Sequence, residues 1–323
     1  MTRAAGTALL TGFFMLLSAV AAQADKRVAL IVGNSAYQHA PALPNPVRDA
    51  QAMAKMFQKA GFDVVNAVYD AGNLDTKRAI RQFEDAAANS DIAVVYFAGH
   101  GIEIHGVNYL IPADAKLLSD RDADDEAIPL DRLLQSVEGA RVLRLVILDA
   151  CRDNPFAHKM MLQRSAALRD INSGLATVEP TSSDTLIAYA ARAGAAAEDG
   201  QADHSPFTAA LLDNLFTPGL DVRLAFRRVR DEVLKKTNKQ QEPFVYGSLG
   251  GANVSLVPAR EQSQQTSDPG RESDDYGRVE KIGTKSAWKT FLAQYPKGFC
   301  ADLARENLAV IERAGEGGGE QAH

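Results

Sequence analysis

The chain has 323 residues, with 35 Lys and Arg against 41 Asp and Glu, and a formal net charge of −6. A mildly acidic chain without a basic stripe is not typical of proteins that bind nucleic acid, so we expect no nucleic-acid partner. The length suits one large α/β domain with an accessory segment.

The first 24 residues have the pattern of an export signal. Arg3 gives a positive start, residues 8–20 form an apolar middle, and Ala22-Gln23-Ala24 gives a small-residue cleavage site. The alternative is a membrane anchor, but this apolar run is shorter than the ~20 residues that a span needs. We therefore expect cleavage after Ala24, a periplasmic or secreted protein, and no membrane association after the signal is removed.

Buried strands alternate with amphipathic helices in the first part of the remaining chain. The strands are expected at 26–34, 62–69 and 92–98, with helices at 45–61 and 74–88 between them. Asn45 and Asp75 are the expected helix caps, and Pro46 stands at a first helical position. This alternation predicts parallel strands with right-handed crossovers.

Two strands end in reactive side chains. The strand at 92–98 leads into Gly99-His100-Gly101, and the apolar run Val142–Leu148 leads into Asp149-Ala150-Cys151. The carboxyl ends of parallel strands are where open α/β sheets place their chemistry. A thiol and an imidazole on two such ends predict a thiolate–imidazole pair.

The rest of the chain contains further short elements and two polar stretches. We expect a hairpin at 102–111, an acidic run at 119–126, a helix at 130–137, a strand at 185–191 and helices at 205–216 and 221–236, followed by strands at 243–249 and 252–256. The segment 157–183 shows no sustained period and is interpreted as a long exposed loop. Its Lys159, Arg164 and Arg169 are the expected positions of self-cleavage.

The motifs YFAGHG (96–101), NYLIPAD (108–114) and DACRDNPF (149–156) occur in an order that resembles the caspase-like cysteine peptidases, in their bacterial metacaspase-like (orthocaspase) branch. ALIVGNSAY (29–37) and TLIAYAARAG (185–194) fit the same pattern. The resemblance implies a three-layer α/β/α sandwich with a mostly parallel caspase-like sheet.

The resemblance also gives the expected domain organisation. The signal peptide at 1–24 precedes a peptidase domain at 25–257, with a large-subunit-like part to about 156 and a small-subunit-like part from about 184. A disordered linker is expected at 258–284 because this stretch is polar and has few apolar residues. A small C-terminal helical hairpin at 285–314 and a tail at 315–323 complete the chain, and the hairpin could pack on a protein partner.

Catalytic roles follow from the resemblance and from thiol chemistry. Cys151 would be the nucleophile, His100 the base, and the backbone N–H groups of Gly101 and Cys151 the oxyanion donors. The alternative for Cys151 is a small buried hydrophobic residue. Four other histidines do not follow a buried strand in a family motif and are expected at the surface: His39, His105, His158 and His204.

The family places two acids in the pocket for the substrate residue before the cut, and these match Asp49 and Asp149. Two carboxylates favour Arg or Lys, so the expected partner is a polypeptide substrate with a basic residue at that position. The alternatives are a favourable charge in the first helical turn for Asp49 and a structural hydrogen-bonding role for Asp149. The family often has Ser where this chain has Ala98, which removes one polar group from the pocket.

No cofactor is required by this mechanism, and calcium (Ca2+) dependence remains an alternative because many metacaspases need it. The acids at 120–126 lack the spacing of a known calcium loop and are interpreted as a solvated loop. Asp114 and Asp131 fall near the family's calcium positions, but the match is too loose to assign metal ligands. A disulfide between Cys151 and Cys300 would block the nucleophile, so both are expected to be free.

The leading hypothesis is an exported cysteine endopeptidase that cleaves after Arg or Lys through an acyl-enzyme. The first alternative is a catalytically silent interaction module in which the C-terminal hairpin recruits a partner. A thiol redox protein is the second alternative, and the absence of a Cys-x-x-Cys pair disfavours it.

Overall fold

A computed structural model describes residues 25–151, 156, 175–176, 178–180, 182–192, 202–259 and 269–316, and for Cys151 it describes the backbone. The chain divides into two compact units, Met1–Ala259 and Arg260–His323, which are described separately below. The predicted export signal, the proposed cleavage positions at 159, 164 and 169, His158 and most of the predicted tail lie outside the described residues. In the described part, no helix is both long enough and apolar enough to span a membrane.

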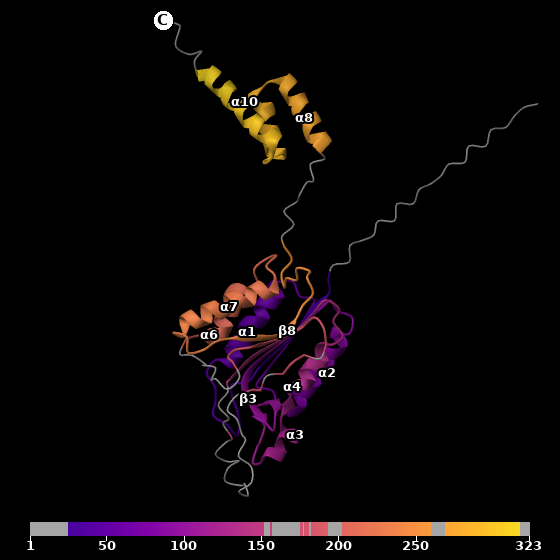
Figure 1. The fold of residues 1–323 in the computed structure, drawn as a ribbon, viewed down its shortest axis with the longest axis vertical. Helices are drawn as coiled ribbons and strands as arrows, with labels where there is room; N and C mark the ends of the chain where they lie inside the picture. The colour runs from indigo at the N-terminus through magenta and orange to yellow at the C-terminus, as the bar shows by residue number, and fades with distance from the viewer. Residues whose placement is uncertain are drawn as a thin grey trace, which may run out of the picture. The chain divides into compact units, whose positions relative to one another are not determined.

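The first unit is built on one twisted sheet with the strand order β2-β1-β3-β6-β7-β8 (Figure 1). All neighbours in this order are parallel except β7 and β8. The expectation of a mostly parallel sheet is therefore confirmed. The strands are β1 (Arg27–Gly33), β2 (Val64–Tyr69), β3 (Ile92–Ile104), β6 (Leu143–Cys151), β7 (Thr185–Tyr189) and β8 (Phe244–Ser248).

Helices cover both faces of this sheet. On one face lie α1 (Pro46–Lys59), α6 (Pro206–Asn214) and α7 (Val222–Lys236), and on the other lie α2 (Asn73–Ala87) and α4 (Leu130–Val137) (Figure 1). Alternate residues of each central strand face opposite sides, so β3 sends Tyr96 into one core and Phe97 into the other. This arrangement confirms the predicted α/β/α sandwich.

An extension of β3 supports the edge of the sheet where the candidate site lies. Beyond the main sheet, β3 forms a hairpin with β4 (Val107–Leu110), which pairs with the short β5 (Ile128–Pro129). A separate apolar cluster fills the space under this hairpin. The acidic run forms the 3-10 helix η1 (Asp120–Asp122) and α3 (Ala123–Glu126).

Three local expectations differ from the structure. Gly72, not Asp75, precedes α2 as its N-cap, and Asp75 lies in the first turn. Asn45 makes no side-chain cap bond at α1, because its Oδ1 accepts from Arg48 instead. Residues 252–256 form no strand. The backbone O of Val254 instead accepts a hydrogen bond from the N–H of Val222, at the start of α7, at 2.8 Å.

The second unit contains α8 (Pro269–Ile282), α9 (Lys285–Gln294) and α10 (Phe299–Glu316). Helix α8 falls within the stretch 258–284 that was expected to be a disordered linker, which corrects that expectation over residues 269–282. The helix forms because Tyr276 and Val279 pack one turn apart on the core of α9 and α10, with the Tyr276 and Trp288 rings 5.2 Å apart. This third helix gives the unit a small core of its own.

Candidate active site

Parallel pairing of β3 and β6 brings the two predicted catalytic residues together. Their register continues without a break from Ile92 opposite Leu143 to His100 opposite Cys151. Neighbouring strands lie about 4.8 Å apart, so these positions become adjacent although they are distant in the sequence. Both lie at the carboxyl edge of the sheet, where open α/β folds carry out their chemistry.

The His100 ring is held in one orientation by a backbone carbonyl. The residue is only 4% exposed, and its Nε2 lies 2.9 Å from the backbone O of Pro41. A carbonyl oxygen only accepts hydrogen bonds, so Nε2 must carry the proton and, in the neutral ring, Nδ1 carries the lone pair. This tautomer leaves Nδ1 as the nitrogen that can take a proton from a thiol.

Tyr37 fixes the backbone next to this ring. Its hydroxyl oxygen accepts from the backbone N–H of His100 at 2.7 Å, and the two rings lie 4.5 Å apart. The contact depends on Gly99, where φ is +152° and an added Cβ would collide with the Tyr37 hydroxyl. The first loop of the chain therefore shapes the backbone of the His strand.

Gly101, the predicted oxyanion donor, is packed from behind by two apolar side chains. A Cβ at this position would lie 3.1 Å from Leu175 Cδ2 and 3.2 Å from the Ala150 Cβ. The carbonyl of the preceding His100 accepts from Ile111 N–H at 3.0 Å. These contacts fix the peptide before Gly101, whose N–H would face the oxyanion.

Leu175 reaches this place because the next residue is bound by a buried amide. Asn108 Nδ2 donates to the backbone O of Ala176 at 2.7 Å, and Asn108 Oδ1 accepts from Ala176 N–H at 2.6 Å. Leu175 itself is buried. The interpretation of 157–183 as an exposed loop is therefore wrong for Leu175, while 157–174, 177 and 181 lie outside the described residues.

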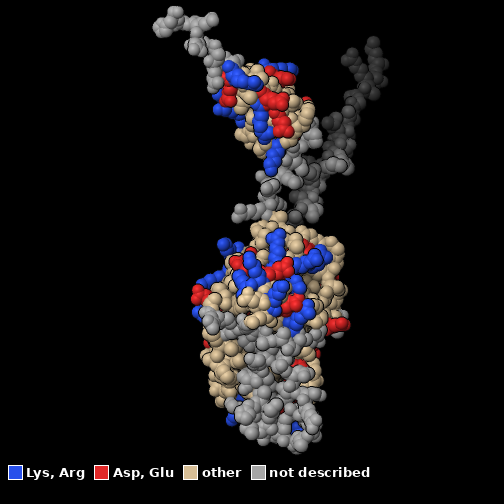
Figure 2. Space-filling model, turned by 60° about the vertical axis from the view of Figure 1, so that its left-hand side comes forward, with Lys and Arg blue, Asp and Glu red and all other residues tan. Residues whose placement is uncertain are grey.

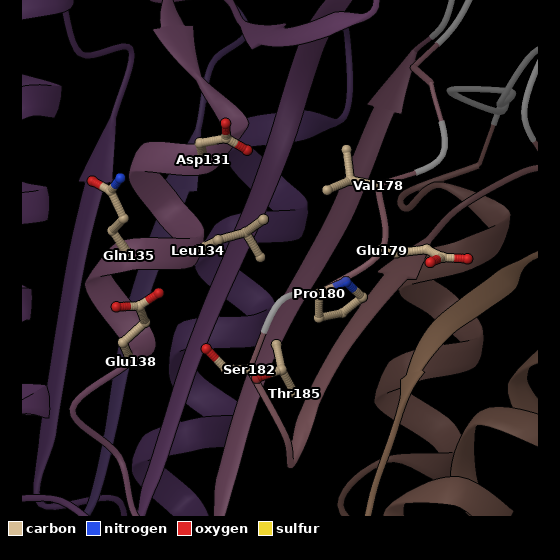
Figure 3. Close-up of a pocket in the computed structure, with 9 residues that line it drawn as sticks. All are labelled: Asp131, Leu134, Gln135, Glu138, Val178, Glu179, Pro180, Ser182 and Thr185. Atoms are coloured by element: carbon tan, nitrogen blue, oxygen red, sulfur yellow. The ribbon is translucent and has the colours of Figure 1, made fainter.

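Beyond this anchor the chain passes along α4 toward β7. Residues 178–180, Ser182 and the start of β7 form one side of a hollow of ≈ 200 Å³, and α4 forms the other (Figure 3). The hollow is lined by Asp131, Glu138 and Glu179 together with neutral polar and apolar side chains, and none of its lining residues is His or Cys. It is separate from the paired residues at the sheet edge.

The two acids predicted for the substrate pocket share one neighbour, Ser205. Its backbone N–H donates to Asp49 Oδ2 at 3.2 Å, and its hydroxyl donates to Asp149 Oδ2 at 2.5 Å. Asp49 comes from the first turn of α1, Asp149 from the end of β6, and Ser205 caps α6. The fold therefore gathers both carboxylates at the amino-terminal end of α6.

Asp149 is buried among hydroxyl donors. Besides Ser205, its Oδ2 accepts from Thr208 Oγ1 at 2.6 Å and from Tyr96 Oη at 3.5 Å. Burial raises the pKa of Asp149 above its usual range, and the three hydrogen bonds oppose this shift only in part. Burial, and then the charges of Asp149 and Asp49, also raise the pKa of Tyr96 well above its ordinary value. Burial therefore disfavours the charged form of Asp149 in this region.

His204 was expected at the surface but contacts Asp49. Its Nδ1 lies 2.6 Å from Asp49 Oδ1, and its side chain is 31% exposed while Asp49 is 1% exposed. Beside it, Arg48 lies 3.7 Å from the exposed Asp203. A basic substrate side chain that approached Asp49 would have to share or replace the His204 contact.

Several residues of this site could not be identified from the sequence. Ser205 and Thr208 fall in the helix expected at 205–216 and Tyr96 in the strand expected at 92–98, and the sequence gives none of them a role in the site. The Ser-Pro start of α6 was the one available sign, because a capping hydroxyl marks a helix end that can also bind a carboxylate. Asn108 lies in the motif NYLIPAD, but nothing in the sequence pairs it with Ala176 or places Leu175 behind Gly101, because these contacts join distant segments.

The acids considered for calcium serve protein contacts in this structure. Asp122 Oδ2 accepts from the N–H groups of Leu118 and Ser119, Asp124 accepts from Tyr109 Oη, and Asp114 accepts from Asn73 N–H. Within the described residues, no group of three His, Cys, Asp or Glu side chains is placed to hold a metal ion. These side chains therefore do not form a ready calcium site.

Comparison with known proteins identifies one family. The family model described as the caspase domain matches residues 26–252. The chain is 25% identical over 130 residues to "Mucosa-associated lymphoid tissue lymphoma translocation protein 1" of Homo sapiens and to its homologue in Mus musculus. Each match covers 40% of this chain but only 15% of the relative.

Among solved structures, the crystal structure of caspase-1 from Spodoptera frugiperda is similar, with a TM-score of 0.49 and 15% sequence identity. The match covers 74% of this chain and 92% of that chain.

The raised pKa of Asp149 predicts a pH-dependent effect of Asp149→Asn. The folded chain favours the protonated form of Asp149. The stability that this form contributes is complete below the pKa of Asp149 in the unfolded chain, and it is lost as the pH rises through the pKa of Asp149 in the folded chain. Asn cannot ionise. The variant should therefore exceed the parent in free energy of unfolding at pH 7, and the difference should shrink as the pH falls.

Urea unfolding between pH 4 and pH 8 measures this effect, and Asp221→Asn is the control with the opposite sign. The Arg223 side chain, which donates hydrogen bonds to Asp221, lowers the pKa of this acid to about 2. Asp221→Asn should therefore lose stability at pH 7. A lower stability of Asp149→Asn at pH 7 than at pH 4, relative to the parent, would contradict the assignment.

Proposed function

The chain belongs to the caspase-domain family of cysteine peptidases, and on that premise we propose that it is an endopeptidase that uses Cys151 and His100 to cut polypeptides after Arg or Lys. The observation that carries this proposal is the register that sets His100 beside Cys151 at the carboxyl edge of the sheet. The contact from His100 Nε2 to Pro41 O supports it, because it leaves the other ring nitrogen for proton transfer.

The proposed reaction uses these groups in sequence. His100 Nδ1 takes the thiol proton of Cys151, and the thiolate attacks the scissile carbonyl carbon. The backbone N–H groups of Gly101 and Cys151 stabilise the oxyanion. The imidazolium then gives its proton to the leaving amine, which leaves a thioester. A water molecule, deprotonated by His100, hydrolyses this thioester and restores the thiol.

The preference for a basic residue rests on the buried acid pair. Two carboxylates that share Ser205 lie in a region where burial already raises the pKa of Asp149. A guanidinium or ammonium group would supply the missing positive charge, and Arg can bind carboxylates through two parallel hydrogen bonds. Asp-ending substrates would add a third negative charge and should be rejected.

The catalytic pair predicts a severe loss in two single variants. Cys151→Ala and His100→Ala should each lower kcat/KM on an Arg-ending fluorogenic peptide by about 10³-fold or more, because the two groups act as a unit. Cys300→Ala is the matched control, since Cys300 lies in the other unit, and it should keep the parent activity. Wild-type turnover by Cys151→Ala would contradict the mechanism and favour a catalytically silent module.

The acid pair predicts the substrate preference. Arg- and Lys-ending peptides should be cleaved and Asp-ending peptides should not, in assays with and without calcium. Asp49→Asn and Asp149→Asn should each cost about 2–5 kcal/mol in transition-state binding of the Arg peptide, because the substrate cation is left half-paired.

The control for this preference is Asp203→Asn, which removes a nearby acid whose side chain is 95% exposed. It should change kcat/KM by less than about threefold, because exposed ion pairs contribute little. An unchanged Arg preference in the Asp49→Asn, Asp149→Asn double variant would remove the pocket assignment.

Export through the first 24 residues is a further part of the proposal, and it rests on the sequence pattern of that segment. The exported chain should begin at Asp25, as amino-terminal sequencing of protein from the periplasm or medium would show. A chain with an Ala24→Leu change should be processed less completely, because the cleavage site needs small residues. Full-length protein confined to the cytoplasm would contradict export.

A further inference from the structure

His204 stands immediately before Ser205, at the end of α6 where the two buried acids meet. Its Nδ1 lies 2.6 Å from Asp49 Oδ1, and the backbone N–H of Ser205 donates to Asp49 Oδ2 at 3.2 Å. Two consecutive residues therefore hold both oxygens of this carboxylate. Because the Ser205 hydroxyl donates to Asp149, the same short segment contacts both acids of the proposed substrate pocket.

The imidazole of His204 is more accessible than the carboxylate that it contacts. The side chain of His204 is 31% exposed, whereas that of Asp49 is 1% exposed. A ligand that approaches from solvent thus meets the imidazole together with, or before, the carboxylate. Since the imidazole can be neutral or positively charged, the charge that the ligand meets at Asp49 depends on the protonation of His204.

The surroundings of His204 favour its neutral form. Burial lowers the pKa of His204 below its ordinary value; the charge of Asp203 opposes this shift, and that of Arg48 adds to it. A carboxylate only accepts hydrogen bonds, so Nδ1 carries the proton in the contact with Asp49. Near neutral pH the ring therefore donates one hydrogen bond and adds no charge. At acid pH its other nitrogen is protonated as well, and the ring becomes a cation beside Asp49.

Two charged side chains of opposite sign flank the ring. Arg48 precedes Asp49 in α1, and its Nη1 lies 3.7 Å from Oδ1 of Asp203, the residue before His204. Their side chains are 48% and 95% exposed, so water screens both. Among the described residues, the charged groups around the ring are thus these two, Asp49 and, through the intervening serine, Asp149. The two flanking charges oppose each other, which leaves the local charge to the imidazole.

The exposed charges of the first unit do not replace this local control. Figure 2 shows a face of this unit on which Lys and Arg lie beside Asp and Glu. Opposite charges are also paired on its surface: Glu242 lies 2.8 Å from Arg192 and 2.6 Å from Arg230, which is itself 3.2 Å from Asp231. Charges paired in this way largely cancel at a distance, and salt screens what remains within about 10 Å. Selection of a basic side chain must therefore depend on groups close to the pocket.

We propose that His204 is a specificity-determining residue of the substrate pocket: the neutral imidazole shares Asp49 with the basic side chain of the substrate, and the imidazolium takes its place. This role rests on the proposed function, because it acts on the same pocket. A carboxylate can accept up to about four hydrogen bonds, so the neutral ring leaves room for a guanidinium. The imidazolium would neutralise Asp49 and repel a second cation a few ångströms away.

A purely structural role for His204 would need only the hydrogen bond from Nδ1. In that case any neutral donor of similar size would serve, and acid would not change substrate binding through this residue. Gln supplies an N–H donor without a titratable charge, and Lys supplies donors with a permanent charge. His204→Gln and His204→Lys therefore separate the hydrogen bond from the charge.

The test measures binding by the full chain carrying Cys151→Ala, so that the peptide is not consumed. The probe is the rhodamine-labelled peptide Leu-Gly-Gly-Arg-Gly-Gly, and the counterpart with Gln in place of Arg reports binding that needs no cation. Fluorescence anisotropy at about pH 8 and about pH 4.5 should show that acid weakens the Arg probe by about tenfold or more. The weak binding of the Gln probe should change less than about twofold.

The variants isolate the part of this loss that belongs to His204, because His100 and Asp149 titrate in all of them. His204→Gln should match the parent within about twofold at pH 8 and bind the Arg probe at least about fivefold more tightly than the parent at pH 4.5. His204→Lys should already bind about tenfold more weakly than the parent at pH 8. His105→Gln is the matched control, since His105 lies 3.7 Å from the acid Asp120 on the hairpin, and it should keep the parent profile. Thermal melts at both pH values show that each variant is folded.

In the chain that retains Cys151, the same change should appear in KM and not in kcat, because the ring acts on binding. At acid pH, His204→Gln should lower KM for an Arg-ending peptide about fivefold relative to the parent, while kcat follows the parent profile.

The inference is overturned by equal pH profiles of the parent and His204→Gln, by parent affinity of His204→Lys at pH 8, or by weak binding of His204→Gln at both pH values. Absence of Arg-probe binding at every pH would remove it together with the acid pocket. Failure of the proposed function alone gives a different result, in which the Cys151→Ala chain binds the Arg probe with the expected profile but the chain with Cys151 does not cleave Arg-ending peptides.

Discussion

The parallel pairing of β3 with β6 is the contact on which the rest of the site depends. Each strand buries alternate residues in two different cores, so Tyr96 beside Ile147 faces α1 while Phe97 beside Leu148 faces α2. A slip of one residue would exchange the two sets of side chains between the cores. The apolar packing therefore fixes the register, and the register fixes His100 beside Cys151.

The acid pair shows how the fold bears an electrostatic cost at the pocket. Burying a carboxylate is unfavourable unless it is paired or hydrogen bonded. Asp149 is buried and receives three hydroxyl donors on one oxygen, yet burial still raises its pKa. The donors come from the start of α6 and from β3, and they offset only part of the cost of burying this acid. The proposed preference for a basic substrate residue would follow from this cost, because a cation that entered would compensate the buried acid pair.

The two halves of the peptidase domain are joined by more than the chain between them. Strands β6 and β7 are paired from Arg144 opposite Thr185 to Leu148 opposite Tyr189. The buried amide of Asn108 holds Ala176, and Leu175 packs behind Gly101. Residues 175–176, which precede the small-subunit-like part, are thus fastened to the hairpin that follows His100 and pack against the predicted oxyanion donor.

The sequence by itself determined the alternation of strands and helices, the mostly parallel sheet and the positions of His100, Cys151, Asp49 and Asp149 within their elements. These properties are local, because apolar periodicity and strand-end motifs can be seen in a short stretch of chain. The tertiary structure alone decided the contacts between distant segments. Each of these contacts joins two residues that are far apart in the sequence, and nothing near either residue indicates its partner. They are Pro41 with the His100 ring, Ser205 with the two acids, His204 with Asp49, and Ala176 with Asn108. Helix α8 escaped prediction for the same reason, since its two apolar side chains become a helix face only when α9 and α10 cover them.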